Sequence, residues 1–226
     1  MTHDNDNVLP KRIRADENHQ RQNSIYPNSL SVLSIVISPD GEQAGNQFCG
    51  FTALHVTKQE MFDGLSFSLS GEGGIGLDPA LQSGLSELFL QKLRPEHMIV
   101  LIGFNETIAS LNACARSYPG QGIEAVLVAL TDLQHRGDVL DLAELINRPN
   151  MTVDDALRLT GNLIPLDRQR EIGAWSVESE AGLLTFFCQR NYVVLFLLQA
   201  LTLPVGEQYA GLLAIWQHMH NSSHKY

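Results

Sequence analysis

The sequence predicts a single α/β (α+β) domain in which a small central β-sheet is flanked by helices and one helical region is enlarged. The chain has 226 residues, of which 44% are hydrophobic and 18% charged, as in folded globular proteins. Short β-branched runs alternate with segments whose apolar residues recur every three or four positions. Residues 1–28 are polar and lack an apolar period, so we expect a mobile arm there and one domain over residues 29–226.

The first third of the domain predicts a strand, a helix and a loop. Residues 31–37 are short, β-branched and followed by a Pro-Asp-Gly turn, which indicates a strand. The apolar residues of 48–62 fit a helix that is largely buried, with Cys49 in its first turn. Residues 64–78 are glycine-rich and predict a flexible loop. They lack both the Lys-Ser or Lys-Thr and the glycine spacing of phosphate-binding loops.

The middle of the chain predicts a helical subdomain over residues 79–156. Its helices are expected where apolar residues are spaced by three and four, at residues 81–93, 108–116, 122–134 and 139–147. A capping-box pattern at residues 152–155 predicts a further helix start. The last third predicts a helix at residues 176–189 and two strands buried on both faces, at residues 192–198 and 212–216.

Composition and charge exclude several classes of function. The formal net charge is −10, and basic residues cluster only at Lys11, Arg12 and Arg14, so we expect no nucleic-acid partner. The acidic N-terminus does not have the pattern of a secretion signal, and the apolar run at residues 192–203 is too short to span a bilayer. We therefore expect no membrane and a cytoplasmic protein, acting inside a host cell if it is an effector or viral protein.

The cysteines are three, widely spaced and without a CxxC pair, which argues against a disulfide framework or a cysteine-based zinc site. Cys49 is the candidate nucleophile, because a thiol at a helix N-terminus near an imidazole becomes a thiolate. The loop before it would supply backbone N–H groups to an oxyanion. The alternative is a buried, inert cysteine, which is how we interpret Cys114 and Cys188.

Three of the eight histidines, His218, His220 and His224, follow the last predicted strand, where a base could reach the thiol. Their spacing is also compatible with a metal site, and solvated histidines are the third alternative. His55 follows Cys49 on the same predicted helix, too far along it to serve as its base. The spacing alone leaves the three readings of the last histidines open.

Three separated segments resemble the OTU (ovarian tumour) family of cysteine proteases. The first is the Pro-Asp-Gly turn at residues 39–41 followed, after an apparent insertion, by Cys-Gly-Phe-Thr-Ala-Leu at residues 49–54. The second is Trp175 with Glu180 at the start of a predicted helix, where Ser176 and Val177 replace the family's two glycines. The third is the predicted strand at residues 212–216 followed by His224.

This resemblance implies a papain-like OTU-type fold and a thiol hydrolase that cleaves isopeptide or peptide bonds after ubiquitin or a ubiquitin-like C-terminus. Cys49 would be the nucleophile and His224 the general base. Because Tyr226 stands where the family often has an Asn or Asp, Asp40 is the candidate third residue. Oxyanion groups would be the backbone N–H groups of Asn46, Gln47 and Phe48. Ubiquitin conjugates would be the partners of a monomer that needs no metal or organic cofactor.

Two alternatives use the same residues differently. Glutamine deamidation or polyprotein cleavage would employ the same Cys-His pair, and Gln43 lies where papain-like enzymes keep an oxyanion-hole glutamine. A catalytically inactive module that binds ubiquitin or another protein would retain the fold without turnover.

Overall fold

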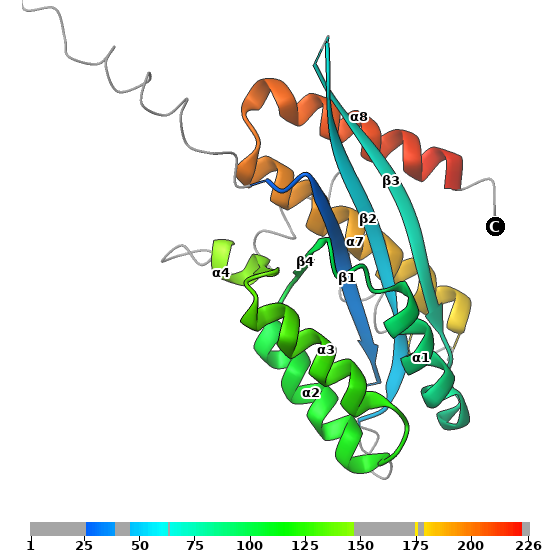
Figure 1. The fold of residues 1–226 in the computed structure, drawn as a ribbon. Helices are drawn as coiled ribbons and strands as arrows, with labels where there is room; N and C mark the ends of the chain where they lie inside the picture. The colour runs from blue at the N-terminus through cyan, green and yellow to red at the C-terminus, as the bar shows by residue number, and fades with distance from the viewer. Residues whose placement is uncertain (1–25, 39–45, 63, 147–174, 176–178, 223–226) are drawn as a thin grey trace, which may run out of the picture.

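The structure is a computed structural model in which residues 26–38, 46–62, 64–146, 175 and 179–222 are described. One five-stranded mixed sheet carries helices on both faces (Figure 1). The predicted class, a mixed α/β protein with a central sheet flanked by helices, is confirmed at this level. Residues 1–25 of the predicted arm lie outside the described residues.

The sheet has the strand order β3-β2-β1-β4-β5, antiparallel on one side of β1 and parallel on the other. Its strands are β1 (Ser29–Ile37), β2 (Phe48–Met61), β3 (Gly64–Ile75), β4 (Met98–Leu101) and β5 (Val139–Asp141). The central strand β1 is buried on both faces, with Val32 in one hydrophobic cluster and Leu33 in the other. The strand predicted at residues 31–37 is therefore confirmed.

Helices cover the two faces of the sheet as separate groups (Figure 1). On one face a short 3-10 turn, η2 (Pro79–Leu81), leads into α1 (Gln82–Lys92), and α2 (Phe104–Ser117) and α3 (Ile123–His135) complete the layer over Leu33. On the other face α7 (Glu180–Thr202) and α8 (Val205–Ser222) pack over Val32, with the short α4 (Leu142–Ile146) beside them. The helices predicted at residues 81–93, 108–116 and 122–134 are confirmed.

The region predicted as a helical subdomain, residues 79–156, is helical in α1, α2 and α3 but also supplies two strands, β4 and β5. Residues 139–147 were predicted to be helical and instead form β5 followed by α4. The helix start predicted at residues 152–155 lies outside the described residues. The helices of this region thus pack on a sheet to which the same region contributes.

The segment that contains Cys49 is a strand, β2, and the helix predicted at residues 48–62 is wrong. Its first nine residues are buried, because β2 lies between β1 and β3 with helices on both faces. A strand buried on both faces has an almost continuous apolar run, which a short window cannot distinguish from a buried helix. The residues predicted as a glycine-rich loop form β3, which pairs with β2 along its full length.

The two strands predicted in the last third are also wrong, because residues 192–198 continue α7 and residues 212–216 lie within α8. Ser179 is the N-cap residue of α7, and its side chain accepts a hydrogen bond from the backbone N–H of Gly182. By length and composition α7 could cross a membrane, but 56% of its apolar window is buried inside the fold. A core helix passes the same test, so this feature is weak evidence for a membrane span.

Gly50 lies where β2 and β3 approach each other most closely. It has a φ of 128°, and a Cβ at this position would overlap the backbone carbonyl of Gly74. We expect Gly50→Ala to lower the free energy of unfolding by about 3 kcal/mol or more, because backbone strain and steric overlap add. The matched control is Gly64→Ala, at a φ of 142° with no atom within 4 Å, which carries only the strain. Urea unfolding measures both, and equal losses would contradict this reading.

Candidate functional site

The predicted nucleophile, Cys49, is the second residue of β2 and is 1% exposed. It packs in a small hydrophobic cluster with Val36, Leu183 and Phe187. The placement at a helix N-terminus, on which its predicted activation depended, is therefore wrong. Asp40, Gln43 and His224 lie outside the described residues, so the predicted meeting of thiol and imidazole stays a prediction.

The electrostatic environment of Cys49 favours the neutral thiol. Burial raises the pKa of Cys49 to about 11, and hydrogen bonds from Ser38 lower it by less. The Sγ atom donates to the carbonyl oxygen of Gln47 at 3.6 Å, which also requires the protonated form. A nucleophilic thiol needs a lowered pKa and access to substrate. The described surroundings of Cys49 provide neither.

The predicted oxyanion residues are at the junction of β1 and β2. The backbone N–H of Gln47 donates to the hydroxyl of Ser38 at 3.1 Å, and its carbonyl accepts from the N–H of Ser38 at 2.9 Å. Phe48 pairs with Ile37 in the ladder and is fully buried, and Asn46 precedes it in the connecting segment. The groups of Gln47 thus hold the strand junction together.

The other candidate residues are also dispersed. His218 and His220 lie on α8, where His218 is near the ring of Tyr192 and His220 stacks on Trp216 at a centroid distance of 5.5 Å. Cys114 is fully buried, as its interpretation as a core residue predicted. Cys188 is half-buried, and burial raises its pKa to about 11.

The burial of Cys49 predicts slow alkylation. At pH 7.5 a thiol with a pKa near 11 has about 100-fold less thiolate than one with the ordinary value of 9.0. We expect iodoacetamide to modify Cys49 at least 100-fold more slowly in the folded chain than in the chain unfolded in urea. Peptide mapping by mass spectrometry separates Cys49 from the other two cysteines. A folded-state rate equal to or above the unfolded rate would show an activated thiol.

A different part of the sheet forms a cleft at the carboxyl end of β4. The strand β4 pairs in parallel with β1, and β1 continues to Ile37, beyond the end of β4. From β4 the chain crosses through α2 and α3 to the parallel strand β5, whereas β1 leads to the antiparallel strand β2. Ligands of α/β proteins bind beyond the carboxyl ends of parallel strands.

The cleft beyond the end of β4 has a volume of about 80 Å³. Its lining comes from β1, the end of β4, α2 and α7, and comprises Leu33, Ser34, Ile35, Leu101, Ile102, Thr107, Arg190 and Val194. A pocket that encloses a whole small molecule measures about 300 Å³ or more. This cleft is therefore large enough only for a terminal group of a larger ligand.

A buried chain of hydrogen bonds holds Ser34, which lines the cleft. The hydroxyl of Ser34 donates to Oδ1 of Asn191 at 2.7 Å, and Nδ2 of Asn191 donates to the hydroxyl of Thr52 at 3.1 Å. All three side chains are at least nine-tenths buried and join α7 to β1 and β2. Because unpaired polar groups are costly in a core, the complete pairing fixes these side chains in place. Ser34 retains lone pairs that can accept from a ligand.

The start of α2 is fixed on the opposite side of the cleft. Asp141, at the end of β5, accepts hydrogen bonds from the backbone N–H groups of Gly103 and Phe104 at 2.9 and 2.8 Å. The hydroxyl of Thr107 donates to the carbonyl of Gly103 at 2.9 Å. The first amides of α2 are thus bonded to a carboxylate of the protein, and Thr107 is held where it lines the cleft.

The lining of the cleft suits binding better than catalysis. Its described residues offer two hydroxyl groups and the guanidinium of Arg190, and none of these residues is Asp, Glu, His or Cys. Ser34 donates to an amide oxygen and has no described base that would activate it. Within the described part of the chain, no group of three His, Cys, Asp or Glu side chains could hold a metal ion. In the sequence only Ser34 stands out, as a polar residue inside an apolar run, because Asn191 follows the polar residues Gln189 and Arg190.

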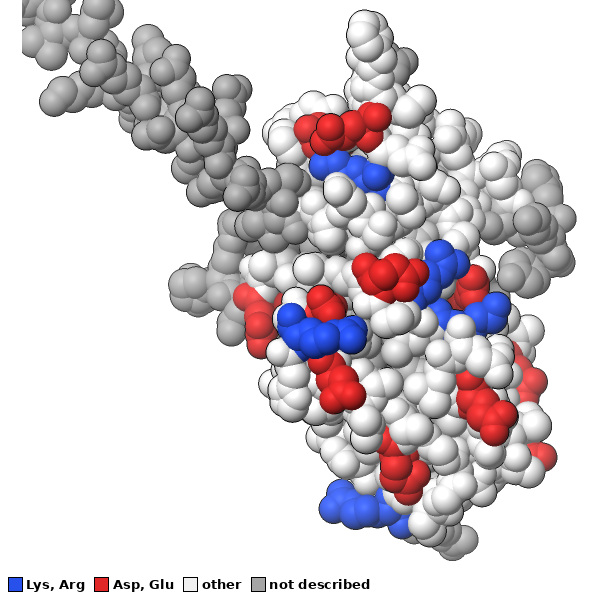
Figure 2. Space-filling model, viewed as in Figure 1, with Lys and Arg blue, Asp and Glu red and all other residues white. Residues whose placement is uncertain are grey.

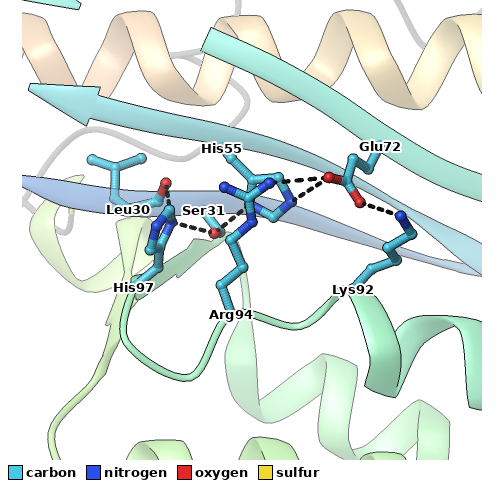
Figure 3. A network of polar contacts seen from close by, with 7 residues as sticks. All are labelled: Leu30, Ser31, His55, Glu72, Lys92, Arg94 and His97. Atoms are coloured by element: carbon cyan, nitrogen blue, oxygen red, sulfur yellow. Dashed lines mark hydrogen bonds and ion pairs between the residues drawn. The ribbon is translucent and has the colours of Figure 1, made fainter. Parts of the chain in front are cut away.

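A second polar cluster lies beneath the connection from α1 to β4 (Figure 3). Ser31 is between two buried imidazoles, 2.7 Å from Nδ1 of His55 and 3.0 Å from Nδ1 of His97. Nδ1 of His97 is also 3.1 Å from the carbonyl of Leu30, which can only accept, so this nitrogen carries the proton. Ser31 then donates to His55, whose Nε2–H points toward Glu72 at 3.9 Å.

Glu72 connects this cluster to two cations on the surface. Lys92 and Arg94 each approach its carboxylate at 3.0 Å (Figure 3). Burial raises the pKa of Glu72, but the hydrogen bonds from both cations outweigh it, and the net direction is downward. For His55, burial and then the charge of Arg94 lower the pKa to about 4. At neutral pH His55 is therefore an uncharged imidazole beside the ionised carboxylate of Glu72.

The low pKa of His55 predicts a dependence of stability on pH. Unfolded His55 takes up a proton near its ordinary pKa of 6.5, whereas folded His55 does so only near 4, so protons favour unfolding between these values. We expect the free energy of unfolding to fall by up to about 3 kcal/mol as pH decreases from 6.5 to 4. Urea unfolding of the wild type and His55→Gln should show a shallower slope in the variant. Identical slopes in the wild type and His55→Gln would refute the assignment.

On the face shown in Figure 2, acidic and basic side chains lie interspersed without a large patch of one sign.

Comparison with known proteins adds no relative, since no family model, no curated protein and no solved structure matches the chain. The cleft and the polar clusters described above are therefore the basis for a functional proposal.

Proposed function

We propose that this chain is a non-catalytic binding protein whose ligand places a terminal group in the cleft between β1 and β4. The observation that carries this proposal is the described lining of the cleft, which combines fixed hydrogen-bonding groups with Arg190 and includes no acid, base or thiol. The cleft also lies beyond the carboxyl end of β4, and ligands of α/β proteins bind beyond the carboxyl ends of parallel strands.

The terminal group is an oxyanion, a carboxylate or a phosphate. Arg190 is the one charged residue of the described lining, and a planar guanidinium matches two oxygens of such a group. The hydroxyls of Ser34 and Thr107 donate to Asn191 and to the carbonyl of Gly103, so the recognition of an oxyanion rests on Arg190. A volume of about 80 Å³ admits a few non-hydrogen atoms, so the remainder of the ligand stays outside. A protein that offers an acidic side chain or a C-terminal carboxylate satisfies this description, as does a small phosphorylated molecule.

The deubiquitinase with a papain-like OTU-type fold stays a prediction. Its motifs in the sequence are its support, while the buried Cys49 in β2 does not favour it. Deamidation and polyprotein cleavage rely on the same thiol and meet the same objection. An inactive module that binds ubiquitin or another protein is compatible with a binding cleft, because binding does not require the thiol.

Binding of simple oxyanions tests the cleft directly. We expect inorganic phosphate or acetate, titrated into the ¹⁵N-labelled full chain, to shift the amide signals of Ser34, Ile102 and Thr107 in NMR spectra. Arg190→Gln should weaken the affinity about tenfold or more, because a charge-assisted pair is lost. The control Arg136→Gln removes an exposed cation that pairs with Asp138, away from the cleft, and should leave the affinity unchanged. Equal binding by both variants, or no shift at the cleft, would contradict the proposal.

The same preparation separates binding from proteolysis. Ubiquitin titrated into the labelled chain should give no hydrolysed product when its C-terminus carries a fluorogenic amide. Turnover that disappears in Cys49→Ala would overturn the non-catalytic assignment in favour of the protease. Shifts at the cleft without turnover would identify ubiquitin as a ligand.

A further inference from the structure

Beyond the end of β4, one edge of β1 has no described strand beside it. β4 pairs with β1 only over Leu30 to Val32, whereas β1 continues to Ile37 (Figure 1). The cleft at the end of β4 follows this open edge, because its lining includes three consecutive residues of β1: Leu33, Ser34 and Ile35. Consecutive side chains of a strand point to opposite faces of the sheet, so a cleft that all three line is at the edge of the strand.

The backbone groups of Ile35 point toward this open edge. Across the pair of β1 and β2, the N–H of Lys58 donates to the carbonyl of Asn28 at 2.7 Å, and the register then continues without a shift to Val36. In an antiparallel pair the backbone groups of alternate residues point to the partner strand, so the even-numbered residues of β1 face β2 and Ile35 faces away from it. Within the described residues, no strand pairs with Ile35 on that side.

A polypeptide backbone is the ligand that matches these groups. An extended chain offers an N–H and a carbonyl at the spacing of a strand, and peptides bind to open sheet edges in this way. The cleft is short, because Leu101 and Ile102 at the end of β4 line it and β4 itself occupies the rest of the edge. A volume of about 80 Å³ in this position suits the end of a chain and not a segment that continues past it.

The charge of the described lining distinguishes the two ends of a chain. Arg190 is a cation, and the described lining has no carboxylate that would pair with an N-terminal ammonium. A C-terminal carboxylate matches the guanidinium of Arg190. The lining is otherwise mainly aliphatic, which favours a small apolar side chain on the last residue of the ligand. The aliphatic residues are Leu33, Ile35, Leu101, Ile102 and Val194.

We propose that the cleft binds the C-terminus of another protein, whose last residues pair with the open edge of β1 as a short strand. Because β4 occupies one end of this edge, the bound chain enters from the side of Ile37 and runs antiparallel to β1. Its backbone groups bond to the N–H and carbonyl of Ile35, and its carboxylate pairs with Arg190. This inference rests on the proposed function, because it names the kind of ligand that the cleft binds.

Short peptides test recognition of the C-terminus in the full chain. The probe is the peptide acetyl-Thr-Gln-Thr-Val with a free carboxylate, since β-branched residues favour the extended form, and the control is the same peptide as its C-terminal amide. We expect the free acid to bind about tenfold or more tightly than the amide. Arg190→Gln should largely remove this difference, whereas Arg136→Gln should retain it. Circular dichroism melting verifies that both variants are folded.

Methylation of the peptide backbone tests the strand pairing without altering the protein. Alternate amides of a bound strand point to β1, so N-methylation at one of two adjacent peptide bonds should weaken binding about tenfold or more, while methylation at the other should have little effect. In the labelled chain, the amide proton of Ile35 should show a nuclear Overhauser effect to the bound peptide.

The outcomes separate this inference from the proposed function. Acetate that binds at the cleft, together with a peptide that does not, would overturn strand addition and leave the oxyanion cleft in place. Absence of binding by both would overturn both proposals. Equal affinities of the free acid and the amide, or equal effects of methylation at the two adjacent peptide bonds, would also overturn the strand addition.

Discussion

The hydrogen-bonded chain of Ser34, Asn191 and Thr52 determines how α7 lies on the sheet. It is a buried polar network inside a mainly apolar interface, and α7 cannot slide or rotate without leaving buried groups unpaired. Arg190 and Val194 are one residue before and three residues after Asn191, so the same anchor sets their positions in the cleft. The geometry of the candidate site thus follows from the interaction that orders this face of the fold.

Much of the fold was predictable from local pattern, and the failures at β2 and α7 share one physical cause. Residues 31–37 and the helices α1, α2 and α3 each have one dominant signal, either β-branched residues before a turn or apolar spacing on one side of a helix. β2 and α7 are buried nearly all round, and such segments lose the period by which strand and helix differ. Only the pairing of β2 with β1 and β3 determines its conformation, and this pairing is a long-range property.

The same cause explains why the candidate site was misplaced. Cys49 was interpreted as a nucleophile because its segment was interpreted as a helix, and in a strand of the central sheet it does not begin a helix and its thiol is buried. Ser34 could have been noticed as a polar interruption of an apolar run, whereas Asn191 follows the polar residues Gln189 and Arg190. Their distance of 157 positions in the chain hides the hydrogen bond between them. A site of this kind becomes visible only when the order of the strands is known.

The packing of α8 against α7 determines which side of α8 faces the core. Gly211 permits the close approach to Gln199 of α7, and Ile215 completes the buried contact one turn further along. If α8 turned by half a rotation to bury Tyr209 and Trp216, bulky side chains would replace Gly211 beside the side-chain amide of Gln199, which would have to move from its hydrogen bond to Tyr26. Packing against α7 therefore favours the observed rotation of α8, in which Tyr209 and Trp216 are exposed. An apolar surface that the fold cannot bury by itself has to be covered by another molecule if it is to leave water.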